Sequence, residues 1–96
     1  MSKLPAVYIM ANKKNGTLYV GVTSNIIKRI YQHKNAETNG FTHRYGCKKL
    51  VYYEQHGDML SAISREKQIK AGSRKDKIAL IESINLEWRD LYEALL

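Results

Sequence analysis

The sequence predicts an α+β domain in which a small three-stranded sheet, antiparallel or mixed, is flanked by helices in the order β-β-α-β-α-α-α. Three observations predict it: two alternating segments that bracket a turn, a third segment rich in β-branched and aromatic residues, and paired helix start and stop signals further on. With 96 residues, of which 44% are hydrophobic, the chain can build one modest core, so we treat residues 1–96 as a single domain.

The first two strands, residues 6–11 and 17–22, should form a hairpin because the run Asn-Lys-Lys-Asn-Gly between them is rich in turn-forming residues. The turn leaves two registers open. Tyr8 lies opposite Tyr19 if the turn centres on the two lysines, and opposite Thr23 if Asn-Gly forms a two-residue turn. Side chains alternate between the faces with a period of two, so both tyrosines share one face in either register.

The two faces of this hairpin differ in chemistry. The face opposite the tyrosines is the predicted core face, which the helices should cover, and it carries Val7, Ile9, Leu18, Val20 and Val22. We therefore expect Tyr8 and Tyr19 to point away from the core of their own sheet, beside Gly21, where another group can approach the backbone closely.

Helix-capping residues and strand-forming composition predict the elements in the middle of the chain. Thr23-Ser24-Asn25 can cap a helix over residues 25–34. Residues 35–47 contain Asn, Thr and two glycines and should form a loop, whereas residues 48–55 have the composition of a third strand.

Three helices should complete the domain. Gly57-Asp58 opens the first, which Gly72 closes, and Ser73-Arg74-Lys75-Asp76 resembles a capping box that starts a second helix through Ile84. Asn85 can cap a last short helix, whose apolar residues are Trp88, Leu91 and Leu95.

The formal net charge of +7 is distributed unevenly along the chain. Residues 1–77 carry fifteen Lys and Arg against five Asp and Glu, whereas residues 78–96 carry one Arg against four acidic residues. A basic body of this kind favours a polyanionic partner, with nucleic acid as the first candidate. A basic surface that serves solubility alone is the alternative.

Cysteine content and hydropathy exclude several classes of protein. Cys47 is the only cysteine, which excludes an intrachain disulfide and a cysteine-rich metal site. The beginning of the sequence has no apolar run long enough for a signal peptide or a membrane span. We therefore expect a cytoplasmic protein without a membrane partner.

Three polar residues interrupt the apolar pattern of the predicted helices. Arg29 and His33 lie four residues apart and so project from one side of a helix, which could also be an ordinary solvated face. Glu66 falls in the middle of an apolar stripe formed by Met59, Ala62, Ile63 and Ile69. A carboxylate there must be paired, protonated or metal-bound, so it either forms a salt bridge to a Lys or Arg or binds a cation such as Mg²⁺.

Further candidates lie at a helix start and in a basic-aromatic cluster. Asn85 is either an N-cap or an amide that orients a carboxylate or a phosphate. The cluster Phe41-Thr42-His43-Arg44-Tyr45 could contact a nucleic-acid backbone or stack on a base. The predicted nucleic-acid-binding residues are Lys28, His43, Arg44, Lys48 and Lys49.

Together these residues resemble the GIY-YIG nuclease superfamily, specifically its small stand-alone single-domain members of the UPF0213-like group. The resemblance covers residues 8–91. Its motif residues occur in the family's order and spacing: Tyr8, Tyr19-Val20-Gly21, Arg29, His33, Glu66 and Asn85. The first motif reads Ala6-Val7-Tyr8 in place of Gly-Ile-Tyr, and Leu86 replaces a proline in the ending Asn-Pro-x-Trp-x-Asp-Leu.

The resemblance implies an endonuclease, a divalent-metal-dependent phosphodiesterase that hydrolyses nucleic acid, with DNA as the expected substrate and DNA repair as a compatible role. Tyr8 would be the general base and Tyr19 its partner, which orients water or phosphate. A tyrosine base requires its pKa, normally about 10, to be effectively lowered by nearby cations. Arg29 would contribute to that lowering and would stabilise the charge of the transition state.

The same resemblance assigns roles to the remaining motif residues. His33 would assist proton transfer or bind phosphate. Glu66 would hold a single Mg²⁺ or Mn²⁺ ion, and Asn85 would be a supporting polar residue near that metal.

Two other classes of function stay open. One is a nucleic-acid-binding module with weak or no catalysis, because no separate DNA-binding domain is apparent. The other is a protein-interaction adaptor that uses the acidic C-terminal helix with Glu87, Asp90 and Glu93.

Overall fold

The computed structural model describes residues 4–35 and 40–96. Its strands form one sheet in the order β2-β1-β3, and both strand pairs are antiparallel. The predicted α+β class is therefore confirmed, with an antiparallel sheet. The elements in chain order are β1 (Ala6–Ala11), β2 (Leu18–Thr23), α1 (Ile26–Lys34), α2 (Phe41–Tyr45), β3 (Lys49–Gln55), α3 (Met59–Ala71), α4 (Arg74–Ile84) and the 3-10 helix η1 (Tyr92–Leu95).

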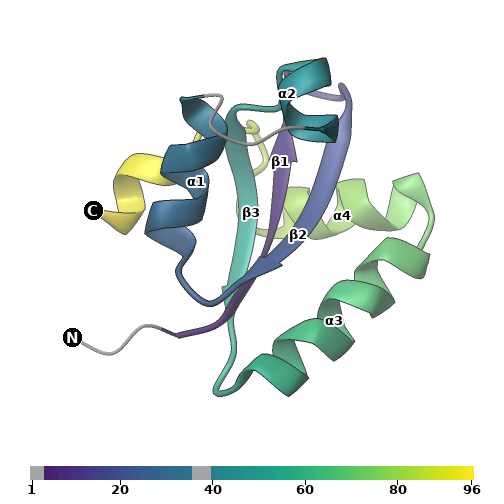
Figure 1. The fold of residues 1–96 in the computed structure, drawn as a ribbon. Coiled ribbons are helices and arrows are strands. Elements are labelled where there is room, and N and C mark those ends of the chain that lie inside the picture. Colours follow the sequence, from purple (N-terminus) through teal and green to yellow (C-terminus); the bar gives the residue numbers. More distant parts are fainter. Residues whose placement is uncertain (1–3, 36–39) are drawn as a thin grey trace.

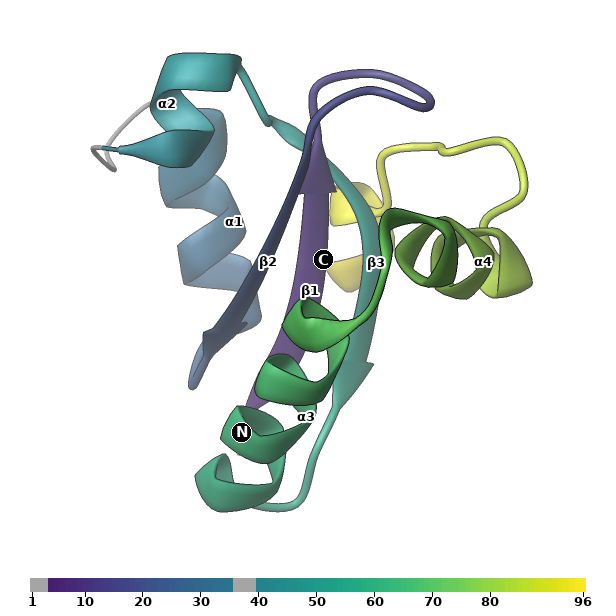
Figure 2. The same cartoon turned by 90° about the vertical axis from the view of Figure 1, so that its right-hand side faces the viewer.

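Helices cover both faces of the sheet. Figure 1 shows α1 on one face and α3 and α4 on the other, and Figure 2 shows the same separation after a quarter turn. The central strand β1 is buried along its whole length. This is expected of a strand that pairs on both edges and is packed against helices on both faces.

The hairpin register differs from both of the predicted registers. Tyr8 pairs with Gly21 and Met10 pairs with Tyr19, which lies between the two alternatives. The side chain of Asn12 accepts a hydrogen bond from the Thr17 amide at 2.8 Å and closes a turn that is longer than either prediction assumed. The prediction that the two tyrosines share one face is confirmed, because the offset is an even number of residues.

The face that carries the tyrosines is a second core, which corrects the expectation that it faces away from the apolar interior. Tyr8 is only 2% exposed, and it packs with Met10 of the same strand and with Ile26 and Ile30 of α1. The hairpin's aliphatic face forms the first core with α3 and α4, as predicted. The alternation within the strands could not predict this second core, because the residues that pack against Tyr8 come from α1, a separate element.

Local capping signals predicted the helix boundaries well. Asn25 caps α1, Asp58 caps α3, and Ser73 and Asp76 form a reciprocal capping box at α4. Each of these side chains accepts a hydrogen bond from a backbone amide that has no partner within the helix.

The predicted loop over residues 35–47 contains a short helix, α2, which is a correction. It ends at Gly46, whose φ of 66° lies in the left-handed region that glycine adopts without strain. Residues 36–39 of that predicted loop lie outside the described residues.

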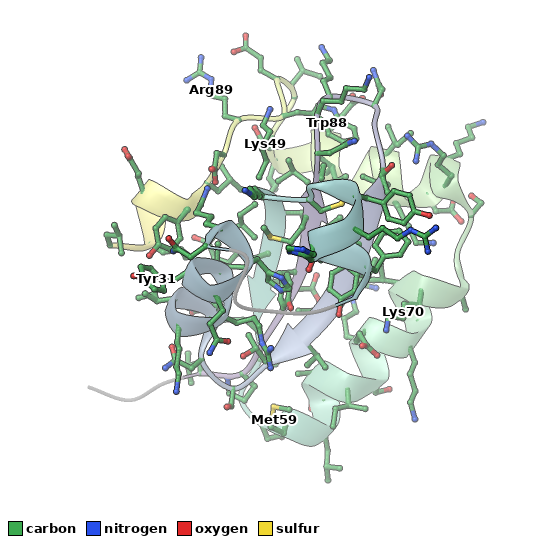
Figure 3. All side chains as sticks on the ribbon, turned by 45° about the horizontal axis from the view of Figure 1, so that its top comes forward. Tyr31, Lys49, Met59, Lys70, Trp88 and Arg89 are labelled. Atoms are coloured by element: carbon green, nitrogen blue, oxygen red, sulfur yellow. The ribbon has the colours of Figure 1, made fainter. Side chains whose placement is uncertain are left out.

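The C-terminal segment also departs from the prediction. Asn85 is the C-cap of α4 and does not begin a helix; the only helical turn after it in the described chain is η1. Trp88 points inward and is fully buried, whereas Arg89 projects outward (Figure 3). Asp90 then forms an ion pair with Lys34 of α1, so the acidic end of the chain is used to hold the fold together.

The Asn85 amide joins this segment to the sheet. Its Nδ2 donates hydrogen bonds to the carbonyl oxygens of Val51 at 3.0 Å and Arg89 at 2.8 Å, and its Oδ1 accepts one from the Arg89 amide at 2.9 Å. The Asn85 side chain is buried, so its own amide and the buried Val51 carbonyl would be unsatisfied without these bonds.

We expect Asn85→Ala to lower the free energy of unfolding by about 2–3 kcal/mol, because buried backbone groups lose their partners. Urea denaturation measures the change. Arg89→Ala is the matched control: it keeps the backbone contacts and removes only an exposed pair with Glu87, so it should change stability by less than about 0.5 kcal/mol. Equal losses in the two variants would contradict the structural role of the amide.

Candidate functional site

Three predicted site residues meet on the face of the sheet that α1 covers. The Oη atom of Tyr8 lies 2.9 Å from Nε2 of His33, within hydrogen-bond distance. The Tyr8 and Tyr19 ring centroids are 6.3 Å apart, and the His33 ring lies 5.6 Å from the first and 5.7 Å from the second. The two tyrosines and the histidine, called the ring cluster below, are therefore brought together as the sequence predicts.

Gly21 makes room for this cluster. A Cβ atom at position 21 would lie 2.5 Å from both Cζ and Oη of Tyr8 and 3.0 Å from Cε2 of Tyr19. The Tyr8 side chain thus crosses β2 where that strand has no side chain. The sequence pointed to close approach at Gly21, and the approaching group is the Tyr8 phenol.

The charges of Arg29 and Glu66 act on Tyr8 in opposite senses. Burial raises the pKa of Tyr8 well above its ordinary value, and the neighbouring Tyr19 adds to this effect. The Arg29 guanidinium lowers the pKa, and the Glu66 carboxylate raises it further. Both charges therefore act on the phenol, but burial outweighs Arg29, and Tyr8 is protonated at neutral pH. Arg29 thus acts on the Tyr8 pKa in the expected direction, and the lowering expected from Arg29 together with a bound metal stays a prediction.

His33 is neutral for the same reason. Burial lowers the pKa of its imidazole to about 4, and the Arg29 charge acts in the same direction. Its second ring nitrogen, Nδ1, lies 3.0 Å from Oγ1 of Thr42 on α2. In the sequence Thr42 stood out only as a member of the basic-aromatic cluster. Its contact with His33 could not be predicted from residue spacing, because the two residues belong to different helices.

Glu66 forms the salt bridge that the sequence offered as one alternative. Its Oε2 lies 3.0 Å from Nζ of Lys70, one turn further along α3. The Glu66 side chain is 14% exposed and that of Lys70 is 51% exposed, so the carboxylate is well sheltered and its cation can move into solvent. Within residues 4–35 and 40–96, no group of three or more His, Cys, Asp or Glu residues could hold a metal ion.

Aromatic rings continue outward from the ring cluster to the surface. Phe41 stacks on Tyr19 with ring centroids 6.0 Å apart, and Tyr45 follows 4.7 Å from Phe41. The Arg44 guanidinium lies over the Tyr45 ring at 5.6 Å. Phe41 and Tyr45 are 44% and 45% exposed, so this row of rings ends at the surface.

Two hollows adjoin the site on either side. The first, of about 250 Å³, is lined by Leu18, Tyr19, Val20, Phe41, Lys70 and Lys77. The second, of about 340 Å³, is polar and lies at the start of α1, where it is lined by Thr23, Ser24, Asn25, Lys28, Arg29 and Gln32. Each hollow therefore combines a residue of the predicted site with cationic side chains.

Comparison with known proteins identifies the family. A family model described as the GIY-YIG catalytic domain matches residues 4–79. The chain belongs to the GIY-YIG family. Membership implies a nuclease-like domain that acts on nucleic acid. In this GIY-YIG chain the two motif tyrosines are Tyr8 and Tyr19, and the glycine of the second motif is Gly21.

Individual relatives agree with this assignment. A UPF0213 protein of Clostridium perfringens is 40% identical over 81 residues, which cover 84% of this chain and 86% of the relative. A UPF0213 protein of Staphylococcus saprophyticus is 38% identical over 68 residues, covering 71% and 83% of the two chains. The solution NMR structure of the UPF0213 protein BH0048 from Bacillus halodurans is similar in fold, with a TM-score of 0.51, 28% identity and coverage of 81% and 82%.

The remaining predicted residues of the GIY-YIG site have different surroundings. The amide of Asn85 is bonded to backbone groups of β3 and the C-terminal segment, and its role as a supporting site residue stays a prediction. Lys28 lines the polar hollow beside Arg29. Neither hollow is lined by the other predicted nucleic-acid-binding residues, which are His43, Arg44, Lys48 and Lys49.

No helix within residues 4–35 and 40–96 is both long enough and apolar enough to cross a membrane.

We expect Gly21→Ala to displace the Tyr8 ring and to lower the free energy of unfolding by about 1–3 kcal/mol, because the new methyl group overlaps the phenol. Urea denaturation and the NMR shifts of the Tyr8 ring measure both effects. Gly57→Ala is the matched control, since a Cβ there has no atom within 4 Å. Similar stability and unchanged Tyr8 shifts in the two variants would refute the steric role of Gly21.

The neutral state of buried His33 should make the protein less stable in mild acid. Its folded pKa of about 4 lies below the ordinary 6.5, so the unfolded chain takes up this proton first. The contribution is fully present above pH 6.5 and is lost as the pH falls toward 4. We expect a loss of about 2–3 kcal/mol across this window, measured by urea denaturation at stepped pH.

His33→Asn is the control for this acid sensitivity, because it removes the titrating group. The slope of stability against pH between 6.5 and 4 should flatten in the variant. A slope that persists unchanged would assign the acid sensitivity to other residues.

Proposed function

We propose that this chain is a divalent-metal-dependent endonuclease that hydrolyses phosphodiester bonds in nucleic acid, with DNA as the expected substrate. The observation that carries the proposal is the convergence of opposite charges on one buried phenol. Arg29 and Glu66 both act electrostatically on Tyr8, which is hydrogen-bonded to His33 and packed beside Tyr19. A hydrolase needs these parts together: an acceptor for the proton of water, a cation for the phosphate and a carboxylate for a metal.

Arg29 is the phosphate-binding residue in this proposal. It lines the polar hollow with Lys28 at the start of α1, where backbone N–H groups at the end of a helix also favour an anion. A phosphate placed there would have two cationic side chains beside it. Arg29 would stabilise the negative charge that grows on the phosphoryl oxygens as water adds to phosphorus.

Tyr8 and His33 handle the proton of the attacking water. The proton passes to Oη of Tyr8 while the phenol's own proton moves to Nε2 of His33, so a free phenolate need not accumulate against the raised pKa of Tyr8. The new P–O bond forms as the bond to the leaving oxygen breaks. A group with a pKa of about 4 holds its extra proton weakly, so His33 returns it to the leaving oxygen or to solvent.

Glu66 has the surroundings of a cation ligand. It is a sheltered carboxylate that already binds one cation, the Lys70 ammonium, and that cation is half exposed and can leave. One carboxylate completed by water and phosphate oxygens is a donor set that Mg²⁺ accepts. When bound, the metal would polarise the phosphate and stabilise the leaving oxygen.

A nucleic-acid-binding module with weak or no catalysis is the second candidate, and two observations favour it. The phenol of Tyr8 is held protonated, and Lys70 already neutralises Glu66. Such a module would bind nucleic acid in a salt-dependent manner without metal and without cleavage.

We expect Arg29→Ala and Glu66→Ala each to reduce the cleavage rate by about 100-fold or more, because each removes a charge that stabilises the reacting phosphate directly or through the metal. The assay is Mg²⁺-dependent cleavage of a panel of single-stranded, duplex, nicked and branched DNA and of RNA, with circular dichroism to confirm folding.

Lys67→Ala, an exposed change on the same helix as Glu66, is the control and should cleave at the wild-type rate. Cleavage that survives both site substitutions would eliminate the proposed mechanism. Salt-dependent binding by a wild-type protein that cleaves nothing on the panel would favour the binding module.

A further inference from the structure

Lys70 lies between two features of the candidate site. On one side its ammonium pairs with the sheltered Glu66 carboxylate at 3.0 Å, four residues back along α3. On the other side Lys70 lines the hollow of about 250 Å³ that Tyr19 and Phe41 also line. The proposed hydrolysis requires only that Lys70 leave Glu66, and it assigns this side chain no further role.

The Lys70 ammonium can change partners at small cost. The Lys70 side chain is 51% exposed, whereas that of Glu66 is 14% exposed. Water therefore screens the pair and competes for the ammonium, which makes ion pairs of this kind weak. A lysine also carries its charge on a flexible stem, so the ammonium can leave Glu66 while α3 stays in place.

A second lysine of the hollow is fixed in position. Nζ of Lys77 donates hydrogen bonds to the carbonyl oxygens of Gly72 at 2.6 Å and Lys70 at 3.3 Å, at the end of α3. These carbonyl groups are uncharged, so they hold the ammonium without neutralising it. No acidic side chain lines the hollow in the part of the chain that the structure describes. The hollow is therefore suited to an anion.

Lys70 and a divalent cation compete for the Glu66 carboxylate. One negative charge cannot offset both a divalent cation and an ammonium, so the two positive groups repel each other at this distance. The displaced ammonium needs a new anionic partner, and the hollow that it already lines has room for one. A phosphate group of nucleic acid there would accept charge-assisted hydrogen bonds from Lys70 and Lys77.

We propose that Lys70 exchanges the Glu66 carboxylate for a phosphate of the nucleic acid and so couples metal binding to substrate binding. The inference rests on the proposed function, which places the metal at Glu66 and the nucleic acid beside it. In the free protein Lys70 occupies the carboxylate and weakens metal binding. With nucleic acid in the hollow Lys70 binds phosphate, and Glu66 is released for the cation. Because linkage is reciprocal, the metal strengthens nucleic-acid binding by the same factor.

The first test needs no nucleic acid. Titration with Mn²⁺, followed by electron paramagnetic resonance, measures the metal affinity of the free protein, and broadening of the Glu66 NMR signals identifies the site. We expect Lys70→Met to bind Mn²⁺ about 3- to 30-fold more tightly than Lys67→Met, because the competing ammonium is gone. Lys67→Met is the matched control, since it removes the same charge from an exposed position on α3. Equal affinities would overturn the inference.

The second test needs no metal. Glu66→Gln releases Lys70, so in EDTA the lysine is available to a fluorescein-labelled DNA oligonucleotide. We expect Lys70→Met to cost about 3- to 10-fold more DNA affinity in the Glu66→Gln background than in the wild-type background. Lys67→Met should cost the same in both backgrounds. An equal cost of Lys70→Met in the two backgrounds would show that Lys70 does not exchange partners.

The outcomes separate this inference from the proposed function. If Mn²⁺ binds at Glu66 and the wild type cleaves, but Lys70→Met behaves as Lys67→Met does, the inference fails and the proposed function stands. A wild type that binds Mn²⁺ and DNA without cleaving contradicts the proposed function, and the two titrations still decide the inference. A protein that binds no Mn²⁺ at Glu66, with or without DNA, contradicts both.

Discussion

The hydrogen bond between Tyr8 and His33 is the contact on which the arrangement of the candidate site depends. It forms inside the apolar layer between the sheet and α1, so three conditions must hold at once. Gly21 must leave room for the phenol, and α1 must present His33 on the same face as Ile26 and Ile30. The central strand must also be covered on both faces, because otherwise the pair would be hydrated and its pKa values ordinary.

Burial shifts the pKa values of Tyr8 and His33 in opposite directions, and both shifts favour the neutral form. It raises the pKa of Tyr8 and lowers that of His33, so both groups are neutral and the bond joins two uncharged groups. A neutral pair is compatible with an apolar layer, whereas an ionised pair would carry a desolvation penalty. The pair is therefore compatible with the apolar layer, and in the proposed reaction added positive charge would be needed to make Tyr8 an effective base.

The position of β2 at the edge of the sheet allows charge to reach this pair. Arg29 belongs to α1 on one face, Glu66 belongs to α3 on the other, and both act on Tyr8. Edge strands usually carry the risk of pairing with another chain, and here the aromatic side chains of Tyr19 and Phe41 and the lysines of the adjoining hollow lie over that edge.

The local sequence by itself determined the elements and the candidate chemistry. Turn residues, caps and the period of two in the strands located the hairpin, α1, α3 and α4, and put Tyr8 and Tyr19 on one face. The resemblance to GIY-YIG proteins selected Arg29, His33 and Glu66 from a chain with many charged residues. These signals lie within short segments or recur in a family, so they can be recognised without knowing how the chain packs.

Only the tertiary structure decided how those residues work together. The register of the hairpin depended on the side chain of Asn12. The second core depended on the packing of α1 over the sheet. The Asn85 amide proved to bind a backbone carbonyl of β3. Thr42 could not be found from its neighbours, because its contact with His33 joins side chains of two different helices. Burial and pKa are properties of the assembled environment, and that environment comes from residues that are distant in the sequence.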